Sequence, residues 1–335
     1  MRICAALACL LAVSAILASA ASAASAASAA SAASAASAAS AASARLAMGI
    51  GDENPQTFTN PSFTALGVKR TRLITAYDGA LSASTAPDAW MNAARLAHEE
   101  IVVAFNPGAG TRCPARPCQP VSASQYTRAF VAFHRRYPFV HIFQPWNEVN
   151  SLTQPTALHP EAVVTYYAIV KRYCPSCTVL GADLEDLAKG PGVPAQIDMV
   201  NYARTLLRDF GKAHVRTPQV WGLHNYVDVN YFHSSGTKAA LSVLPGQLWL
   251  TETGGIAEFT LSSGKVRLKY DLARQARATN WLMQLALSNK RITRVYLYDL
   301  FYAGTNRFDS SLLGPGLTPR KAYYALAAHW KKYFA

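Results

Sequence analysis

Two glutamates stand directly after strongly apolar segments, where a carboxylate is costly unless it serves a purpose. Glu148 follows the segment HIFQPWN, and Glu252 ends the segment LWLTE. A single buried glutamate of this kind is more often structural, held by hydrogen bonds or by a cation. Two carboxylates that face one another, one protonated and the other ionised, are what the cleavage of a glycosidic bond requires. Acid-base and nucleophilic catalysis by Glu148 and Glu252 is therefore the first hypothesis.

Other apolar segments also end in polar side chains. Trp146 could be a sugar-stacking ring or a core residue, and the pattern does not separate the two. His224 could be a hydrogen-bonded core histidine, although its place at the end of a segment favours the site. Asp52 and Glu53 could bind sugar hydroxyls, but local capping is the simpler explanation. The polar residues at these ends are Asp52, Glu53, Asp78, Asn106, Asn147, Glu148, Asp183, His224, Asn225, Tyr226, Glu252, Tyr298 and Asp299.

Eight β-rich apolar segments alternate with stretches of helical periodicity. The predicted strands are 46–51, 71–77, 100–105, 141–146, 178–182, 219–226, 248–252 and 294–300. The predicted helices are 86–100, 122–137, 160–173, 194–212, 268–290 and 319–334. Their continuous apolarity indicates parallel strands covered on both faces. This order and length predict an α/β fold, a (β/α)8 TIM barrel forming a single domain over residues 45–335. A doubly wound sheet is the main alternative, but no GxGxxG or P-loop follows a predicted strand.

The sequence resembles the clan A retaining glycoside hydrolases, (β/α)8 enzymes that include families 5 and 39. The resemblance covers roughly Met48 to Tyr333 and depends on the order and strand position of short motifs. It implies that Asn147-Glu148, after the fourth strand, contains the acid/base. It also implies that Glu252, after the seventh strand, is the nucleophile.

The same resemblance assigns further residues to a sugar site. Arg72 takes the place of an arginine that supports the nucleophile, and His224 and Tyr226 correspond to residues that line the site. Asn147 is expected to bond the sugar 2-hydroxyl group. The family commonly has a tryptophan after the eighth strand, whereas this chain reads VYLYDLF there. Tyr298 or Phe301 would replace it as a sugar platform.

The amino terminus has the pattern of an exported precursor. Met1-Arg2 precedes an apolar run that ends in small residues, which predicts a signal peptide over residues 1–20. Residues 21–44 repeat Ala-Ala-Ser and are expected to form a low-complexity linker. We therefore expect a secreted, extracellular protein that is not bound to a membrane after the signal is removed.

Four cysteines remain after residues 1–20, in the motifs CPARPC and CPSC. An exported chain meets an oxidising compartment, so we expect two local disulfides, Cys113 with Cys118 and Cys174 with Cys177. One zinc site made from all four is the alternative, although the spacing is irregular. A redox CxxC centre is less favoured, because CPSC follows a helical stretch and does not begin one.

Composition and charge narrow the classes of partner. The chain has 335 residues, 51% apolar and 15% charged, which excludes a disordered protein. Its formal charge is +13, but no nucleic-acid motif occurs and the basic residues are dispersed. We expect a monomer that needs no cofactor or metal and acts on an oligosaccharide or polysaccharide. The alternatives are a non-catalytic polysaccharide-binding barrel, or a metal-dependent deacetylase or esterase, for which no HExxH or GxSxG motif is present.

Overall fold

The computed structural model describes residues 46–108, 113–114, 118–187, 194–261, 263–302, 304 and 307–333. The predicted signal peptide and the Ala-Ala-Ser linker lie outside the described residues. Within the described part, no helix has both the length and the apolarity needed to cross a membrane.

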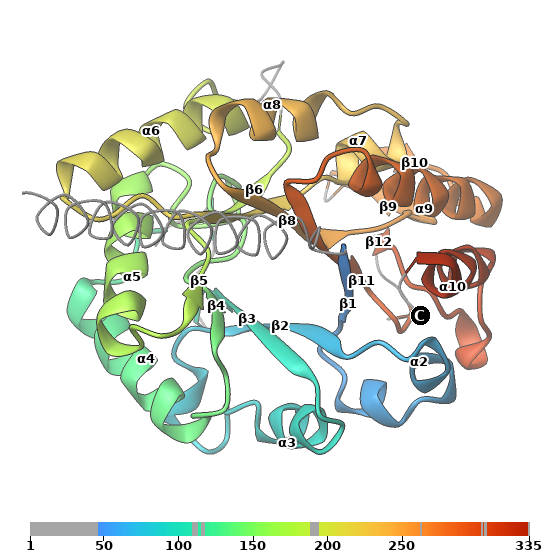
Figure 1. The fold of residues 1–335 in the computed structure, drawn as a ribbon, viewed down its shortest axis with the longest axis horizontal. Coiled ribbons are helices and arrows are strands. Elements are labelled where there is room, and N and C mark those ends of the chain that lie inside the picture. Colours follow the sequence, from blue (N-terminus) through green and yellow to red (C-terminus); the bar gives the residue numbers. More distant parts are fainter. Residues whose placement is uncertain are drawn as a thin grey trace, which may run out of the picture. The chain divides into compact units, whose positions relative to one another are not determined.

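Parallel strands form the centre of the fold (Figure 1). The central sheet of the described residues has the strand order β5-β4-β3-β2-β1-β11-β8-β7-β6. Its strands are β1 (Ala47–Gly51), β2 (Arg70–Ala76), β3 (Glu100–Asn106), β4 (Ile142–Gln144), β5 (Thr178–Val179), β6 (Asp183–Glu185), β7 (Val220–His224), β8 (Gln247–Thr253) and β11 (Ile292–Tyr298).

The predicted fifth strand is in fact two short strands, β5 and β6, and the break between them closes the barrel. β5 pairs with β4, and β6 pairs with β7. Between them, the Leu180 N–H donates to the Phe143 carbonyl (3.0 Å) and the Gly181 N–H donates to the Val220 carbonyl (2.9 Å). The segment changes partners at this point and so joins both edges of the sheet. The predicted (β/α)8 barrel is confirmed, with one strand corrected.

Helices surround the strands on the outside of the barrel (Figure 1). Pro160 begins its helix as predicted, and Ser122 and Gln125 form a capping box at the start of α4. The short helices α2, α7 and α8 were not predicted, and Tyr226 begins α7 instead of ending a strand. The α-helices are α2 (Pro61–Leu66), α3 (Asp88–Leu96), α4 (Ala123–Arg136), α5 (Pro160–Tyr173), α6 (Met199–Lys212), α7 (Tyr226–Asn230), α8 (Ser235–Val243), α9 (Leu272–Leu287) and α10 (Lys321–Tyr333).

A small antiparallel sheet, also unpredicted, is formed by two strands that follow the seventh barrel strand and one that follows the eighth. It consists of β9 (Glu258–Thr260), β10 (Val266–Leu268) and β12 (Phe308–Asp309), in the order β10-β9-β12. Strands of two or three residues that do not lie within a longer apolar run leave too short a pattern to be recognised in a sequence. This sheet, which we call the canopy sheet, contributes side chains to the cavity described below.

The barrel interior has an apolar floor with polar side chains above it. The floor contains Val102, Ile142, Leu180, Trp249 and Tyr296, all of them buried. Side chains alternate along a strand, so the residue two positions further along points the same way. Gln144 therefore lies above Ile142, and Thr251 lies above Trp249. Because of this alternation, the buried polar side chains at the carboxyl end of the barrel rest on a packed apolar layer.

Both predicted disulfides are present. Cys113 bonds to Cys118 in the loop after β3, and Cys174 bonds to Cys177 between α5 and β5. Because the four sulfurs form two bonds, the alternative of a shared zinc site is wrong. The first disulfide belongs to a loop that lines a separate small cavity with the segment after β4.

The buried carboxyl group of Glu99, between α3 and β3, should make the stability of the folded protein depend on pH. Both of its carboxylate oxygens are buried and have no hydrogen-bond partner among the described residues. Burial raises the pKa of Glu99 to about 7, so its folded pKa lies above its unfolded value of 4.5. The folded state then holds the proton more tightly, and stability falls as pH rises from 4.5 to 7.

Replacing Glu99 by glutamine removes this ionisation cost. We expect Glu99→Gln to raise the Tm by about 2–4 °C at pH 8 and by much less at pH 4.5. Thermal unfolding at both pH values measures the difference. Glu161→Gln, at an exposed position on α5, is the matched control. It removes only a solvent-exposed ion pair with His159 and should change the Tm by less than Glu99→Gln does at pH 8. An equal shift of the Glu99 variant at both pH values would contradict the explanation.

Candidate active site

Arg72 is the centre of a buried polar network above the apolar floor. It lies on β2 and is 1% exposed. Its guanidinium donates to Gln144 Oε1 (2.6 Å), Glu252 Oε2 (2.8 Å), Asn147 Oδ1 (2.6 Å) and Asp183 Oδ2 (2.8 Å). One planar cation thus holds side chains from β4, its following loop, β6 and β8. Arginine suits this role because its five donors have a fixed geometry.

Asp183 is the second buried charge of the network. Its Oδ2 accepts from Arg72 and from His224 Nε2 (2.9 Å), and its Oδ1 accepts from the Thr251 hydroxyl. Burial favours the neutral carboxyl, but the charges of His224 and Arg72 outweigh it and lower the pKa of Asp183 to about 2. A Cβ at Gly222 would lie 2.3 Å from Asp183 Oδ1, so only glycine leaves room for this arrangement.

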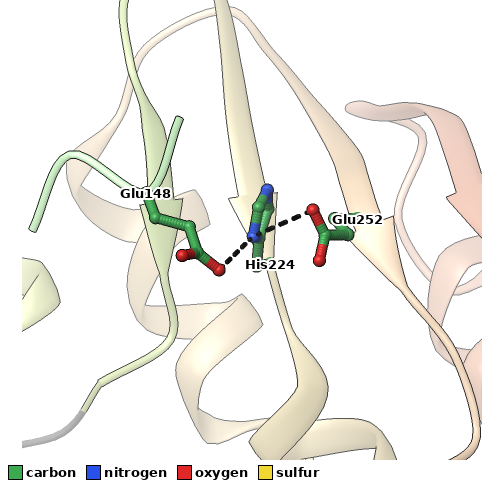
Figure 2. Close-up of side chains that lie close together, drawn as sticks. All are labelled: Glu148, His224 and Glu252. Carbon is green, nitrogen blue, oxygen red and sulfur yellow. Dashed lines mark hydrogen bonds and ion pairs between the residues drawn. The ribbon is translucent and has the colours of Figure 1, made fainter. Parts of the chain in front are cut away.

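His224 lies between the two candidate catalytic glutamates (Figure 2). Its Nδ1 is 3.2 Å from Glu148 Oε1 and 3.7 Å from Glu252 Oε2. Burial alone would lower the pKa of His224, but the charge of Asp183, the charge of Glu252 and the hydrogen bonds raise it well above its usual value. As an imidazolium, His224 donates from both ring nitrogens and neutralises part of the surrounding negative charge.

The two glutamates come together as their sequence positions predict. One oxygen of each carboxylate and one nitrogen of His224 all lie within 4.8 Å of one another. Glu148 has a left-handed backbone conformation, with φ of 48°, which a residue other than glycine rarely adopts. The flanking hydrogen bonds from Asn147 N–H to Phe105 (2.8 Å) and from Val149 N–H to Asp183 (2.9 Å) hold it there. Strain that the surrounding structure maintains is typical of functional positions.

Two tyrosines surround Glu252. The Tyr226 hydroxyl donates to Glu252 Oε1 (3.2 Å), and the Tyr298 hydroxyl donates to Glu53 Oε2 (3.1 Å). Burial and the negative charges of Asp52 and Glu252 raise the pKa of Glu53 to about 7. Glu53 therefore belongs to the electrostatic surroundings of Glu252.

A cavity of about 690 Å³ opens over the two glutamates. One end is polar and includes Glu148, His224 and Glu252, with Tyr298 and Glu185 beside them. From Tyr226 of α7, which bonds Glu252, the wall continues ring against ring to Phe308 and then to Phe259 of the canopy sheet, and these residues lead to the other end. Burial, followed by the charge of Glu148, raises the pKa of Glu185 to about 8. The full lining is Glu148, Glu185, Asp186, Leu187, His224, Tyr226, Val227, Asn230, Tyr231, Glu252, Ile256, Phe259, Leu261, Arg267, Leu268, Tyr298 and Phe308.

The structure corrects one predicted binding residue. Trp146 is fully buried, packs against Tyr126 and Tyr166, and donates its indole N–H to Gln154 (3.0 Å). A ring without exposed surface cannot stack on a sugar, so the assignment of Trp146 to substrate binding is wrong. Its neighbours fill the space between the strand and the helices, which makes it a core residue.

The remaining predicted residues lie around the glutamates, with different degrees of access. His224, Tyr226 and Tyr298 line the cavity, whereas Arg72 and Asn147 lie beneath it and contact Glu252 or each other. Phe301, the other candidate for the missing tryptophan, does not line the cavity. Asp52 is 4% exposed and accepts from the backbone N–H groups of Asn54, Leu300 and Phe301, so it is structural.

Sequence reasoning missed two contributors to the site, Gln144 and Glu185, and gave no role to a third, Asp183. Gln144 and Asp183 anchor Arg72, and Glu185 lines the cavity beside Glu148. Each interrupts or follows an apolar segment, the same signal that identified Glu148. The pattern did not indicate that a cation from another strand would bind two of them.

Glu148, His224 and Glu252 also have the spacing of a three-ligand metal site. A metal-bound histidine must be neutral, because a ring nitrogen has to supply its lone pair. The raised pKa of His224 opposes that state, and the Arg72 guanidinium, which already bonds Glu252 Oε2 (2.8 Å), places a positive charge beside the position that a cation would occupy. The donor set therefore fits an ion-pair network better than a metal centre.

Comparisons with known proteins identify the architecture. No protein-family model and no curated protein sequence matches the chain. Among solved structures, the chain is similar to a family 39 glycoside hydrolase from Bacteroides cellulosilyticus, with 15% identity and a TM-score of 0.51 over 85% of this chain and 64% of the other. A GH128 (subgroup I) endo-β-1,3-glucanase from Amycolatopsis mediterranei has 15% identity and a TM-score of 0.52 over 84% of this chain and 99% of the other. Xylanase 10B from Thermotoga maritima is 10% identical to the chain, with a TM-score of 0.58 over 87% of this chain and 96% of the other.

The fold is that of TIM-barrel glycoside hydrolases. The resemblance predicted from the sequence is thus confirmed at the level of the fold. The chain spans less than two thirds of the length of the family 39 structure. At identities of 10–15%, the similarity concerns the architecture, and the chemistry has to be argued from the side chains.

Replacing Arg72 should greatly lower the stability of the folded protein. Arg72→Met leaves the buried Asp183 carboxylate without its guanidinium partner, and we expect the free energy of unfolding to fall by about 3–5 kcal/mol. Denaturant unfolding of the purified variant measures the loss. Arg172→Met, an exposed position on α5, is the control and should change stability by less than about 0.5 kcal/mol. Equal stability of the two variants would show that the network does not depend on Arg72.

Proposed function

We propose that this protein is a retaining glycoside hydrolase, with Glu252 as nucleophile and Glu148 as acid/base. The observation that carries the proposal is the approach of the two carboxylates, whose nearest oxygens lie within 4.8 Å. Carboxyl groups about 5–5.5 Å apart suit a covalent intermediate, whereas about 6.5–9.5 Å leaves room for water in an inverting reaction.

In the first step, a Glu252 oxygen forms a bond to the anomeric carbon while the glycosidic bond breaks. Glu148 transfers its proton to the departing oxygen, so the leaving group departs as a neutral alcohol. Arg72 and the Tyr226 hydroxyl hold the attacking carboxylate in place through Oε2 and Oε1. The product of this step is a glycosyl ester of Glu252.

In the second step, water attacks the anomeric carbon of the ester and gives its proton to Glu148. Glu252 leaves as a carboxylate, and both glutamates return to their starting protonation states. Arg72 holds the Asn147 amide oxygen, which leaves the amide N–H₂ group as the donor for the sugar 2-hydroxyl group. That hydrogen bond strengthens as positive charge develops on the sugar ring.

Solved structures of this fold and the two disulfides bear on the substrate and on the location of the protein. Solved structures with this fold include glycoside hydrolases in complex with laminaritriose and xylobiose, which supports a saccharide substrate. Two disulfides support an extracellular protein.

Covalent trapping tests the proposal. A panel of 2,4-dinitrophenyl 2-deoxy-2-fluoro glycosides should inactivate the protein. Fluorine slows both the formation and the hydrolysis of the ester, and the good leaving group restores the rate of formation only, so the ester accumulates. We expect one sugar per chain on the peptide that contains Glu252, identified by mass spectrometry. Turnover of unmodified glycosides with a label on another residue would overturn the assignment. Saccharide binding without any turnover would support the non-catalytic barrel instead.

A further inference from the structure

The two ends of the cavity differ in chemistry. The polar end contains Glu148, His224 and Glu252. The opposite end is lined by apolar side chains of the canopy sheet and of the segments beside it: Ile256, Phe259, Leu261, Leu268 and Phe308. A sugar bound there would bring several hydroxyl groups against surfaces that cannot bond them, which costs free energy.

Two polar side chains of the apolar end, Asn230 and Asp186, are already engaged by the protein. Arg267 and Tyr231 also line the cavity, but both are exposed, so their polar tips can reach solvent. The Asn230 amide N–H₂ group donates to the carbonyls of Tyr226 (3.0 Å) and Gly254 (2.9 Å), and its oxygen accepts from Ile256 N–H (2.7 Å). The Asp186 carboxylate accepts from the N–H groups of Val227 (3.3 Å) and Asp228 (3.0 Å). These side chains hold α7 and the loop after β8 in place and offer little to a sugar.

The aromatic rings do not form a sugar platform. Tyr226 and Phe308 meet edge to face, with ring centroids 5.1 Å apart and planes at 86°. Phe308 and Phe259 do the same at 5.5 Å and 81°. A pyranose ring stacks on one open, flat aromatic face, whereas interlocked rings form an irregular apolar wall. Such a wall suits a hydrocarbon group.

The position of the reacting groups decides what occupies each end. The sugar ring that bonds to Glu252 carries several hydroxyl groups, so it must lie toward the polar side chains of the lining, such as Tyr298 and Glu185. The apolar end then remains for the group on the other side of the glycosidic oxygen. That group departs once Glu148 has protonated the oxygen.

We infer that the apolar end binds an alkyl or aryl leaving group, so that the substrate is a glycoside of an apolar alcohol and not an internal bond of a polysaccharide. This inference rests on the proposed function, because it assigns the leaving-group side of the same site. It names the chemical class of the substrate that the glutamates alone do not specify.

A series of alkyl glycosides tests the inference on the unmodified protein. Methyl, butyl and hexyl glycosides of the sugar accepted in the trapping panel have similar leaving-group reactivity, so differences in kcat/KM report mainly burial of the chain. We expect kcat/KM to rise at least about 10-fold from methyl to hexyl, a fraction of the effect of fully burying five methylene groups. A disaccharide with the same non-reducing sugar should be a poorer substrate than the hexyl glycoside.

Phe259→Ser tests the wall directly. We expect it to lower kcat/KM for the hexyl glycoside by about 5-fold or more relative to the methyl glycoside. Phe139→Ser, another partly buried phenylalanine, lies in the turn before β4 and should keep the wild-type chain-length dependence. If Phe259→Ser does not fold, the alkyl glycoside series on the unmodified protein still tests the apolar subsite.

The outcomes separate the two proposals. Turnover that does not increase with chain length, or that is fastest on the disaccharide, overturns the apolar subsite and leaves the glycoside hydrolase intact. No turnover of any glycoside, with no covalent label, overturns the proposed function itself and the inference with it.

Discussion

Glu252→Ala is expected to lower kcat for glycoside hydrolysis by about 10⁴-fold or more, because it removes the nucleophile of the first step. The fold should survive, since Arg72 loses one partner but keeps its buried ion pair with Asp183. Initial rates on an aryl glycoside of the accepted sugar measure the loss. Glu161→Ala, at an exposed position on α5, should keep wild-type activity.

Sodium azide makes the test of Glu252 more specific. In Glu252→Ala, azide can enter the vacated space and attack the anomeric carbon, so part of the activity should return. The product should be a glycosyl azide with the anomeric configuration opposite to that of the substrate, which NMR identifies. A variant with nearly full activity, or an azide product of retained configuration, would show that another residue is the nucleophile.

Glu148→Ala is expected to give the second largest effect, and the loss should depend on the leaving group. Alkyl glycosides need a proton on the departing oxygen, so their kcat/KM should fall by about 10²–10⁴-fold. Dinitrophenyl glycosides need no proton, so their first step should be little changed. Steady-state kinetics on the two classes of substrate measures the contrast.

Azide distinguishes this variant from the nucleophile variant. The glycosyl ester of Glu252 still forms in Glu148→Ala, but water attacks it slowly without a base. Azide needs no base and should release the sugar as a glycosyl azide of retained configuration. Equal losses on alkyl and dinitrophenyl substrates, or a lack of azide product, would contradict the role given to Glu148.

Several elements of this protein could be predicted from local patterns. The barrel strands are apolar runs of sufficient length, and the two disulfides join cysteines that are near one another in the sequence. The canopy sheet was missed because β9, β10 and β12, of two or three residues each, do not lie within longer continuous apolar runs, as the equally short barrel strands β4 and β5 do. The pairing of such strands is decided by the long segments around them.

The sequence also placed Trp146 equally well in the core and in the site. Its surroundings come from Tyr126 on α4 and Tyr166 on α5, and only the packing of these helices on the barrel removes the ring from solvent. The same limitation applies to Asp183. Its position after an apolar run was evident, but its bonds to Arg72 and His224 join residues 111 and 41 positions away.

The amino-acid sequence by itself determined the order of strands and helices, the disulfide partners and the two strand ends that carry Glu148 and Glu252. These depend on runs of a few neighbouring residues, whose burial and hydrogen bonding are set locally. Only the tertiary structure decided that His224 lies between the two carboxylates, that Arg72 connects four strands or loops, and that the cavity has an apolar end. Those features arise when barrel closure brings distant side chains into contact, and their electrostatic energies depend on distances that no local pattern encodes.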